Sequence, residues 1–240
     1  MKMGASVACA TLLCLAAASA AAGSFSVAPT RVEFDAGRRT AVVTINNPDA
    51  SPLTVQVAAV DWQQPGGADS YAPTADILAT PPVFTVAPNS EQIVRIALRR
   101  APGGGNELPY RIFFQEVPPA PKPGSNTLNV ALRVGIPVFV QGRCDEALPA
   151  LRWTAARAAN GDIALSAENT GCMHVQVTGL SVQFGDGAFV PLSAIKYVLP
   201  GNRMTWTLTP PAGADASQLH IQGDTDRGEI HGAASLTPAS

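Results

Sequence analysis

The stretch NTLNVALRVGIPVFVQG, residues 126–142, is a long apolar segment in which hydrophobic residues recur at alternating positions. Successive side chains of a β-strand point to opposite faces, so this pattern predicts a strand. One face would carry the apolar residues Leu128, Val130, Leu132 and Val134. The other face would carry Arg133 and Gly135. Strands usually contain roughly 3–10 residues, and this one could run well beyond that.

A long apolar strand at a sheet edge is an aggregation hazard that proteins normally blunt. Its presence here indicates that the edge is used to pair with another chain, which is β-augmentation. The alternative is an ordinary last strand of a sheet, with its apolar face in the core. The Pro-rich segment VPPAPKPGS, residues 117–125, precedes the strand. Such a segment favours extended polyproline II and cannot pair as a central strand.

The rest of the chain predicts an all-β protein. Short period-2 segments separated by turn residues recur throughout, for example TAVVTINN (residues 40–47) and VQVTGLSVQF (residues 175–184). Such spacing is typical of β-sandwiches, and no segment keeps a helical period with proper caps. The length suits two domains of about 100 residues each. We expect the boundary in QGRCDE, residues 141–146.

The first residues predict export. Residues 1–22 combine Lys2, an apolar middle and a small-residue end, as in a cleavable signal peptide. We therefore expect domains at residues 23–142 and 143–240. The chain that remains has Cys144 and Cys172 as its only cysteines. In an oxidising compartment such a pair predicts one disulfide, and two buried thiols are the alternative.

The residues that would support catalysis or metal binding are missing from the sequence. Its three histidines, His174, His220 and His231, form no HExxH-like spacing. Met173 next to His174 is a weak sign of a copper site and fits an ordinary strand end better. No GxSxG or CxxC motif is present. Net charge is −2, without a basic block. We expect no enzyme, no cofactor, no metal and no nucleic-acid partner.

Three arginines could fix the register of a partner strand. They are Arg31 in PTRVEF, Arg111 in PYRIFF and Arg133 in the long strand. A one-residue slip turns every side chain of a strand to the wrong face, so register must be specified. The planar guanidinium fork suits a carboxylate such as the C-terminus of a partner chain. For each arginine the alternative is an exposed charge of little energetic value.

These residues together resemble the periplasmic chaperones of the chaperone–usher pilus pathway, the PapD-like family. The matching pieces are PTRVEF (29–34), VQVAAVDW (55–62), TPPVFTVAPNSEQIVRI (80–96), ELPYRIFFQEVPP (107–119) and the strand that ends in PVFV (137–140). They occur in the family's order over residues 25–142. The second half is similar more loosely, through ENTGCMHVQVTGL (168–180) and GDTDRGEI (223–230).

The resemblance implies a periplasmic protein of a Gram-negative bacterium, with two immunoglobulin-like β-sandwich domains arranged in an L. Its last N-terminal-domain strand would complete pilin subunits that lack their own final strand, and an outer-membrane usher would receive them. Leu128, Val130, Leu132 and Val134 match the alternating residues of this donor strand. The family's cleft arginine falls on Arg31, but Pro137 stands where a lysine is usual. Arg111 and Arg133 would supply the positive charge of that lysine. The segment LRVGIPVFV, residues 132–140, is similar to the archaic Csu-type branch of the family.

The resemblance also implies a buried ion network near the domain junction. Arg95 and Glu107 match two of its members, and Asp226 is the expected third, with Asp224 as a rival. Breaking one member of a buried network costs roughly 3–5 kcal/mol.

A structural protein, either a pilus subunit or an adhesin, is the rival interpretation. A pilin would carry an extended N-terminal donor segment and would lack its own final strand. Here the expected mature chain runs almost directly into FSVAPTRVEF, residues 25–34, and a final strand is present. The chaperone is therefore favoured, and self-capping of the unbound chaperone through the same strand is a further hypothesis.

Overall fold

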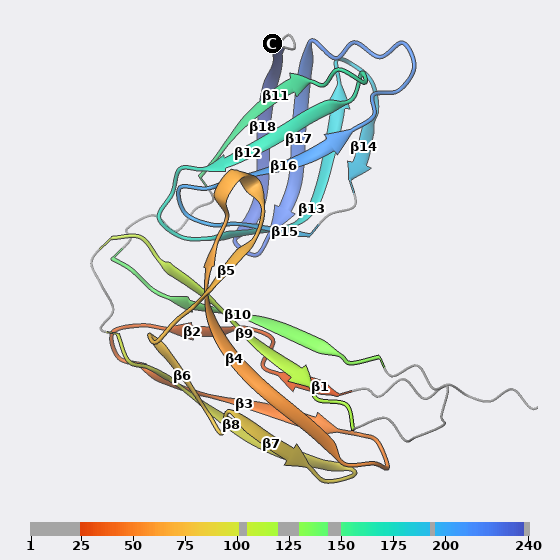
Figure 1. Ribbon diagram of the computed structural model, residues 1–240. Coiled ribbons are helices and arrows are strands. Elements are labelled where there is room, and N and C mark those ends of the chain that lie inside the picture. Colours follow the sequence, from red (N-terminus) through yellow and green to blue (C-terminus); the bar gives the residue numbers. More distant parts are fainter. Residues whose placement is uncertain (1–24, 101–104, 120–129, 144–149, 193–194, 238–240) are drawn as a thin grey trace, which may run out of the picture.

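The computed structural model describes residues 25–100, 105–119, 130–143, 150–192 and 195–237. The predicted signal segment, residues 1–22, lies outside these ranges. The described chain is all-β apart from one 3-10 helix, η1 (Pro65–Gly67). It forms two β-sandwiches set at an angle to one another, with the extended β4–β5 hairpin reaching from the first toward the second (Figure 1). The immunoglobulin-like, L-shaped architecture predicted from the sequence is confirmed. Nothing in the described part is an apolar helix long enough to cross a bilayer.

Two facing sheets make up the first sandwich. One has the order β1-β3-β8-β6, and the other has the order β2-β10-β9-β4-β5, with β7 also paired to β4. The strands are β1 (Ser26–Ala28), β2 (Val32–Phe34), β3 (Thr40–Asn47), β4 (Leu53–Gln63), β5 (Ser70–Pro73), β6 (Ile77–Thr80), β7 (Val83–Val86), β8 (Ser90–Leu98), β9 (Leu108–Glu116) and β10 (Arg133–Val140).

The core of this sandwich follows directly from period-2 patterning. Val43 and Ile45 of β3 and Val94 and Ile96 of β8 are fully buried, while the residues between them point outward. Burial of one such side chain stabilises the fold by roughly 1.5–3 kcal/mol. Ile112 of β9 adds the facing sheet to the same core.

The second sandwich follows the order β14-β13-β17-β18-β11-β12-β16, with β15 also paired to β13. Its strands are β11 (Leu151–Arg157), β12 (Ile163–Asn169), β13 (Val175–Phe184), β14 (Phe189–Leu192), β15 (Lys196–Val198), β16 (Arg203–Leu208), β17 (Gln218–Thr225) and β18 (Gly228–Thr237). Trp153 and Trp206 pack in its core with ring centroids 5.8 Å apart.

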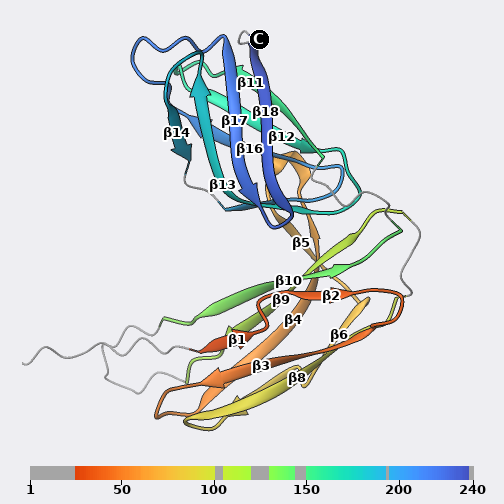
Figure 2. The same cartoon turned by 180° about the vertical axis from the view of Figure 1, so that it is seen from behind.

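The chain changes sheets between its first two strands. β1 pairs with β3 in one sheet, and β2 pairs in parallel with the end of β10 in the other. Viewed from behind, β2 lies beside β10 near the second domain (Figure 2). Pairing with β2 covers only Val138–Val140 of β10. Among the described residues, Arg133–Pro137 therefore have a strand on one side only, and this stretch of β10 is called the open edge below.

The strand is shorter than its sequence pattern predicts. β10 contains 8 residues, and Val130 and Leu132 precede it. The Glu116 N–H of β9 still donates to the Leu132 carbonyl over 2.9 Å. In this register the next bond to Val130 would need an N–H from the residue two positions after Glu116, which is Pro118. Proline has no N–H, so the ladder ends there.

Candidate functional site

The open edge places the apolar residues of β10 at the rim of the first core. Val134 and Leu132 are partly buried against that core. Val130 lies just before the strand and is 71% exposed. Leu128, the fourth residue of the predicted donor strand, lies outside the described residues. The described part thus offers an apolar row that becomes more exposed with distance from the junction.

The backbone of the open edge is also available for pairing. The bond between Glu116 and Leu132 shows that even-numbered residues of β10 direct their polar backbone groups toward β9. The backbone N–H and C=O groups of odd-numbered residues therefore point away from β9, because the direction of these groups alternates along an antiparallel pair. The Arg133 and Gly135 N–H and C=O groups point to the open side, whereas Pro137 has no N–H to offer there.

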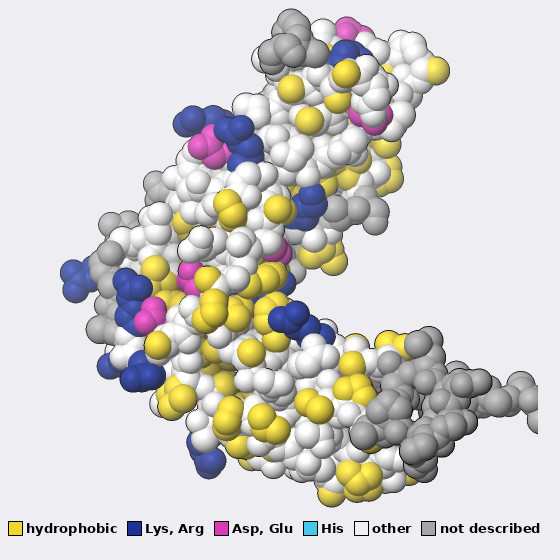
Figure 3. Space-filling view, viewed as in Figure 1, with side chains coloured by type: hydrophobic (Ala, Val, Ile, Leu, Met, Phe, Trp, Pro, Cys, Tyr) yellow, Lys and Arg dark blue, Asp and Glu magenta, His cyan; other side chains and the backbone are white. Residues whose placement is uncertain are grey.

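Arginines and aromatic rings line the sheet face that is directed at the second domain. Arg133 lies over the ring of Phe113 at 3.8 Å, and Phe113 meets the edge of Tyr71 at 5.2 Å between centroids. Arg111 lies over Trp62 at 4.1 Å and donates to the Tyr71 hydroxyl over 2.9 Å. Figure 3 shows Lys or Arg side chains beside hydrophobic ones on the inner side of the bend.

Gly135 makes this arrangement possible. A Cβ at this position would lie 2.7 Å from Cε1 of Phe113 and 3.4 Å from Cδ of Arg111. The first distance is a clash with the ring. Glycine therefore lets the Phe113 ring lie across β10, where this ring supports the guanidinium group of Arg133.

The two predicted anchors on this face differ in their electrostatic partners. Arg111 has the carboxylate of Asp69 at 3.9 Å, and its side chain is 19% exposed. Arg133 is exposed and forms no ion pair with any residue that the structure describes. Cation–π contacts with Trp62 and Phe113 orient both groups without neutralising their charge. Both can therefore receive an anion on the inner side of the bend.

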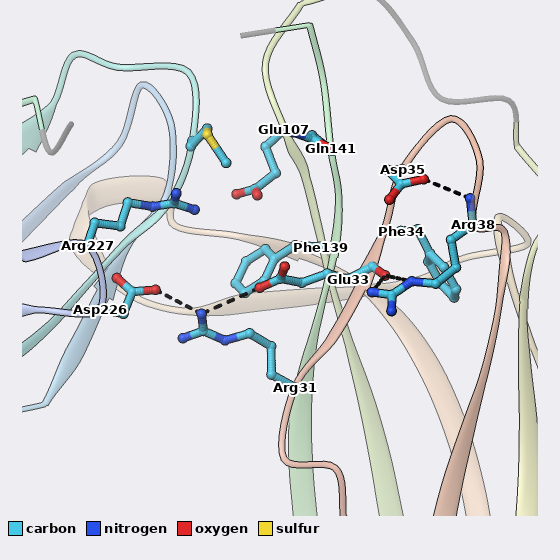
Figure 4. Close-up of a pocket in the computed structure, with 11 residues that line it drawn as sticks. Arg31, Glu33, Phe34, Asp35, Arg38, Glu107, Phe139, Gln141, Asp226 and Arg227 are labelled. Atoms are coloured by element: carbon cyan, nitrogen blue, oxygen red, sulfur yellow. Dashed lines mark hydrogen bonds and ion pairs between the residues drawn. The ribbon is translucent and has the colours of Figure 1, made fainter. Parts of the chain in front are cut away.

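Arg31, the third predicted anchor, belongs to the domain junction. Its Nη1 lies 2.9 Å from Oδ2 of Asp226 and 3.6 Å from Oε1 of Glu33. Its Nη2 donates to Oε1 of Gln176 over 2.7 Å. Figure 4 shows the guanidinium between the two carboxylates, in a pocket of about 240 Å³. The side chain is 27% exposed. Arg31 thus holds the two domains together, at the point where β2 closes the open edge.

A buried histidine is the centre of the junction. His174 is fully buried, and its ring stacks on Phe139 with centroids 3.5 Å apart and planes 7° apart. Its Nδ1 lies 2.6 Å from Oε2 of Glu107, which also accepts the His174 backbone N–H over 2.8 Å. Its Nε2 lies 3.3 Å from Oδ2 of Asp226. Glu107 of the first domain and Asp226 of the second are therefore linked through one imidazole.

The predicted ion network was partly wrong. Glu107 and Asp226 do meet at the junction, and Asp226 takes the position for which Asp224 was the rival. Arg95 does not join them. Its neighbours Val94 and Ile96 are buried, so alternation turns Arg95 outward on the outer face of the β1-β3-β8-β6 sheet. Arg31 and His174 supply the positive charge that Arg95 was expected to bring to these carboxylates.

The charges around His174 favour its protonated form. Burial by itself lowers the pKa of this histidine, but the nearby carboxylate of Asp226 and the hydrogen-bonded carboxylate of Glu107 outweigh burial and raise the pKa above its usual range. Burial likewise opposes ionisation of Asp226, but His174, the Gln176 backbone N–H and Arg31 lower its pKa to about 2. The junction therefore favours an imidazolium between two carboxylates.

The contribution of the junction to the free energy of unfolding should depend on pH both above and below neutrality. Because the pKa of His174 is raised, its contribution is complete below about 6.5 and is lost as pH rises through the folded value. Because the pKa of Asp226 is lowered to about 2, its contribution is present above about 3.9 and is lost as pH falls toward 2. We expect a higher melting temperature at pH 5.5 than at pH 9.

Calorimetry of the wild type and of His174→Gln across this range checks the expectation. The variant should lose the decline on the alkaline side. Other charged or titratable groups near the imidazole are Arg31, Arg227 and Tyr197. His231→Gln is the matched control, because His231 lies at the surface with a 74% exposed side chain. Equal slopes for wild type and His174→Gln would contradict the assignment.

Several junction residues were not predicted. Gln64 is buried and bridges the domains, with its Nε2 donating to the Tyr197 carbonyl over 2.9 Å and its Oε1 accepting from Leu199 N–H over 3.0 Å. Trp62, Phe139 and Leu199 form a small cluster there. The only signal in the sequence was that Phe139 lies on the Arg133 face of the strand.

The expected disulfide falls partly within the described ranges. Cys172 is disulfide-bonded. Cys144 lies outside the described residues, so the pairing of the two stays a prediction. Within the same ranges no group of three or more His, Cys, Asp or Glu side chains could hold a metal ion.

Comparison with known proteins finds a sequence family that matches half of the chain. Residues 24–143 match the sequence family described as "Pili and flagellar-assembly chaperone, PapD N-terminal domain". A comparison with curated proteins finds no match.

Solved structures share the fold over nearly the whole chain. The chaperone–tip adhesion subunit complex CsuC–CsuE of Acinetobacter baumannii matches with TM-score 0.67 and 20% identity, covering 90% of this chain and 100% of that one. The YadV chaperone matches with TM-score 0.62 and 21% identity, covering 88% and 99%. The Salmonella enterica complex of SafA pilin with the SafB chaperone matches with TM-score 0.61 and 23% identity, covering 88% and 96%.

Proposed function

We propose that this chain, which belongs to the PapD family of pilus-assembly chaperones, captures pilin subunits by lending them the open edge of β10. A subunit that lacks its final strand would receive β10 as a temporary replacement. The similar complexes CsuC–CsuE and SafA–SafB contain a chaperone with a tip subunit or a pilin, which supports a partner of this class. The reaction involves no covalent chemistry, only strand pairing and burial.

The open edge is the observation that carries this proposal. Within the part of the chain that the structure describes, the backbone groups of Arg133 and Gly135 have no strand partner on this side, and they lie next to the apolar side chains of Val130, Leu132 and Val134. Burial of each apolar side chain contributes roughly 1.5–3 kcal/mol, and each backbone hydrogen bond adds roughly 0.5–1.5 kcal/mol. These contributions suffice for capture, and release requires only another strand that pairs better.

The arginines favour one direction for the incoming strand. Arg111 lies directly across from Pro137, near the junction end of the open edge, and Arg31 precedes β2 at the same end. A C-terminal carboxylate would be stabilised there, so the subunit strand would run parallel to β10. Arg133 lies further along the edge and would bind the same carboxylate only in a shifted register.

Charge reversal on the inner face should separate the anchors from ordinary arginines. We expect Arg111→Glu to weaken subunit capture by at least about tenfold, because a carboxylate would then face a carboxylate. Arg133→Glu should have a smaller effect, unless the shifted register is used. Arg95→Glu is the matched control, since Arg95 is exposed on the opposite sheet. Capture is measured as the amount of subunit that copurifies, and equal losses in all three variants would remove the anchor argument.

The experiment that tests the function is copurification from the periplasm. The tagged full-length chain is expressed in its native host, and bound proteins are identified by mass spectrometry. We expect a small, secreted, β-rich subunit. The proposal includes export by the signal peptide at residues 1–22 and delivery of the subunit to an outer-membrane usher. If no such subunit is bound, or the chain is retained in the cytoplasm, the proposed function fails.

Without a subunit, the same edge would be available to a second copy of the chain. We include such self-capping in the proposal, because the requirement is the same: an apolar edge with unpaired backbone groups. The two states would exclude each other at one site.

A further inference from the structure

We propose that Pro137 is the register stop of the open edge, so that the last residue of the incoming strand lies opposite Ile136. This inference rests on the proposed function, since it specifies how a subunit strand would pair with β10. It assigns a positioning role to a residue that stands where the family usually has a lysine.

The bond pattern of β2 shows how a parallel neighbour pairs with this edge. Phe34 of β2 lies opposite Val140, and its carbonyl accepts the N–H of Gln141 over 2.8 Å. On the parallel partner, the carbonyl of a residue thus accepts the N–H of the residue that follows the one opposite to it. Its own N–H points to the carbonyl of the residue that precedes the one opposite to it. An incoming strand that continues the same edge toward Arg133 must follow the same rule.

Along the open edge, this rule gives a complete set of backbone bonds opposite Val134 but an incomplete set opposite Ile136. A residue opposite Val134 donates to the Arg133 carbonyl and accepts the N–H of Gly135. The next edge-facing residue lies opposite Ile136 and donates to the Gly135 carbonyl. Its own carbonyl would need the N–H of residue 137, and proline has none. A peptide carbonyl left there without a donor costs binding energy.

A terminal carboxylate removes this difficulty. Its oxygens can accept bonds from side chains, and Arg111 is the direct cross-strand neighbour of Pro137 on the inner face. Further extension is also blocked, because Val32 of β2 already occupies the edge from Val138 onward. The missing donor, the neighbouring cation and the start of β2 all place the chain end at the same point.

Pro137→Ala provides a direct test, because it adds a single N–H on the open side. Hydrogen exchange is followed by NMR on ¹⁵N-labelled chain, alone and with the subunit that copurifies with wild type. In the unbound variant the new amide at position 137 has no strand partner among the described residues and should exchange faster than the paired amides of β10. In the complex it should exchange at least about tenfold more slowly, together with the amides of Arg133 and Gly135. Pro73→Ala, at an exposed position of β5, is the matched control for folding.

The three amides separate the two levels of the proposal. Protection of Arg133 and Gly135 but not of the new amide at position 137 would overturn the register stop and leave donor-strand capture standing. Protection of none of the three in a stable complex would overturn pairing at the open edge, and the inference with it. Failure of the wild type to bind any subunit would overturn both.

Subunit length gives an independent readout. A subunit with two glycines added to its C-terminus should bind wild type about tenfold more weakly, since its carbonyl opposite Ile136 lacks a donor and its carboxylate is displaced. Pro137→Ala supplies that donor, so the variant should bind the extended subunit better than wild type does. Equal binding of both subunit forms by wild type would contradict the assignment.

Discussion

Replacing Leu132 with Asp should abolish subunit capture while the chain stays folded. Leu132 lies next to the open edge, is only partly buried in the unbound chain, and its backbone N–H is 3.1 Å from Oε2 of Glu116. In a complex its side chain would become enclosed between two proteins. Burying an unpaired carboxylate there costs several kcal/mol, so we expect at least about a hundredfold loss of capture. Copurification from the periplasm and circular dichroism of the purified variant measure capture and folding.

Controls separate loss of the site from loss of the fold. Val42→Asp makes the same kind of change at a 50% exposed position of β3, away from β10, and should leave capture intact. If Leu132→Asp itself unfolds, Val130→Asp replaces it, because Val130 is largely exposed in the unbound chain. Leu132→Asp should also remove any self-capped oligomer in light scattering. Normal capture by both variants would contradict use of the apolar row.

Replacing Glu107 with Ala should cause the largest loss of stability. Glu107 is buried and accepts two hydrogen bonds from His174, one from the backbone and one from the ring. Its removal leaves a buried imidazolium with a single carboxylate partner, Asp226. Removing one partner of a buried ion pair costs roughly 3–5 kcal/mol. Urea unfolding followed by circular dichroism measures the loss, and small-angle scattering should show a less fixed angle between the domains.

The matched control is Glu229→Ala, since the Glu229 side chain is 80% exposed and lies 3.9 Å from His231 at the surface. It should change stability by less than about 1 kcal/mol. The double variant Glu107→Ala with His174→Ala should be less unstable than the sum of the single changes, because the buried charge is then gone. Additive losses would show that the two residues do not act as a pair.

Much of the fold was determined by local pattern. Thr40–Asn47 and Arg133–Val140 became strands because hydrophobic residues at every second position can be buried only if the chain is extended. The same alternation placed Arg133 on the face that avoids the core. It also identified the strand with the exposed apolar row. These properties depend on neighbours along the sequence, so the sequence alone was sufficient to predict them.

The junction depended on tertiary structure. His174 reads in sequence as an ordinary polar residue after Met173, and its role arises only because Glu107 and Asp226 approach it from two domains. Arg31 and Arg95 have the same chemistry and both occupy strand-like positions, yet one lies at the junction and the other faces away from it. The end of the ladder at Pro118 likewise required the register with β9. Sequence determines which face a side chain takes within its strand, because that choice is local, whereas its partners depend on how sheets and domains pack.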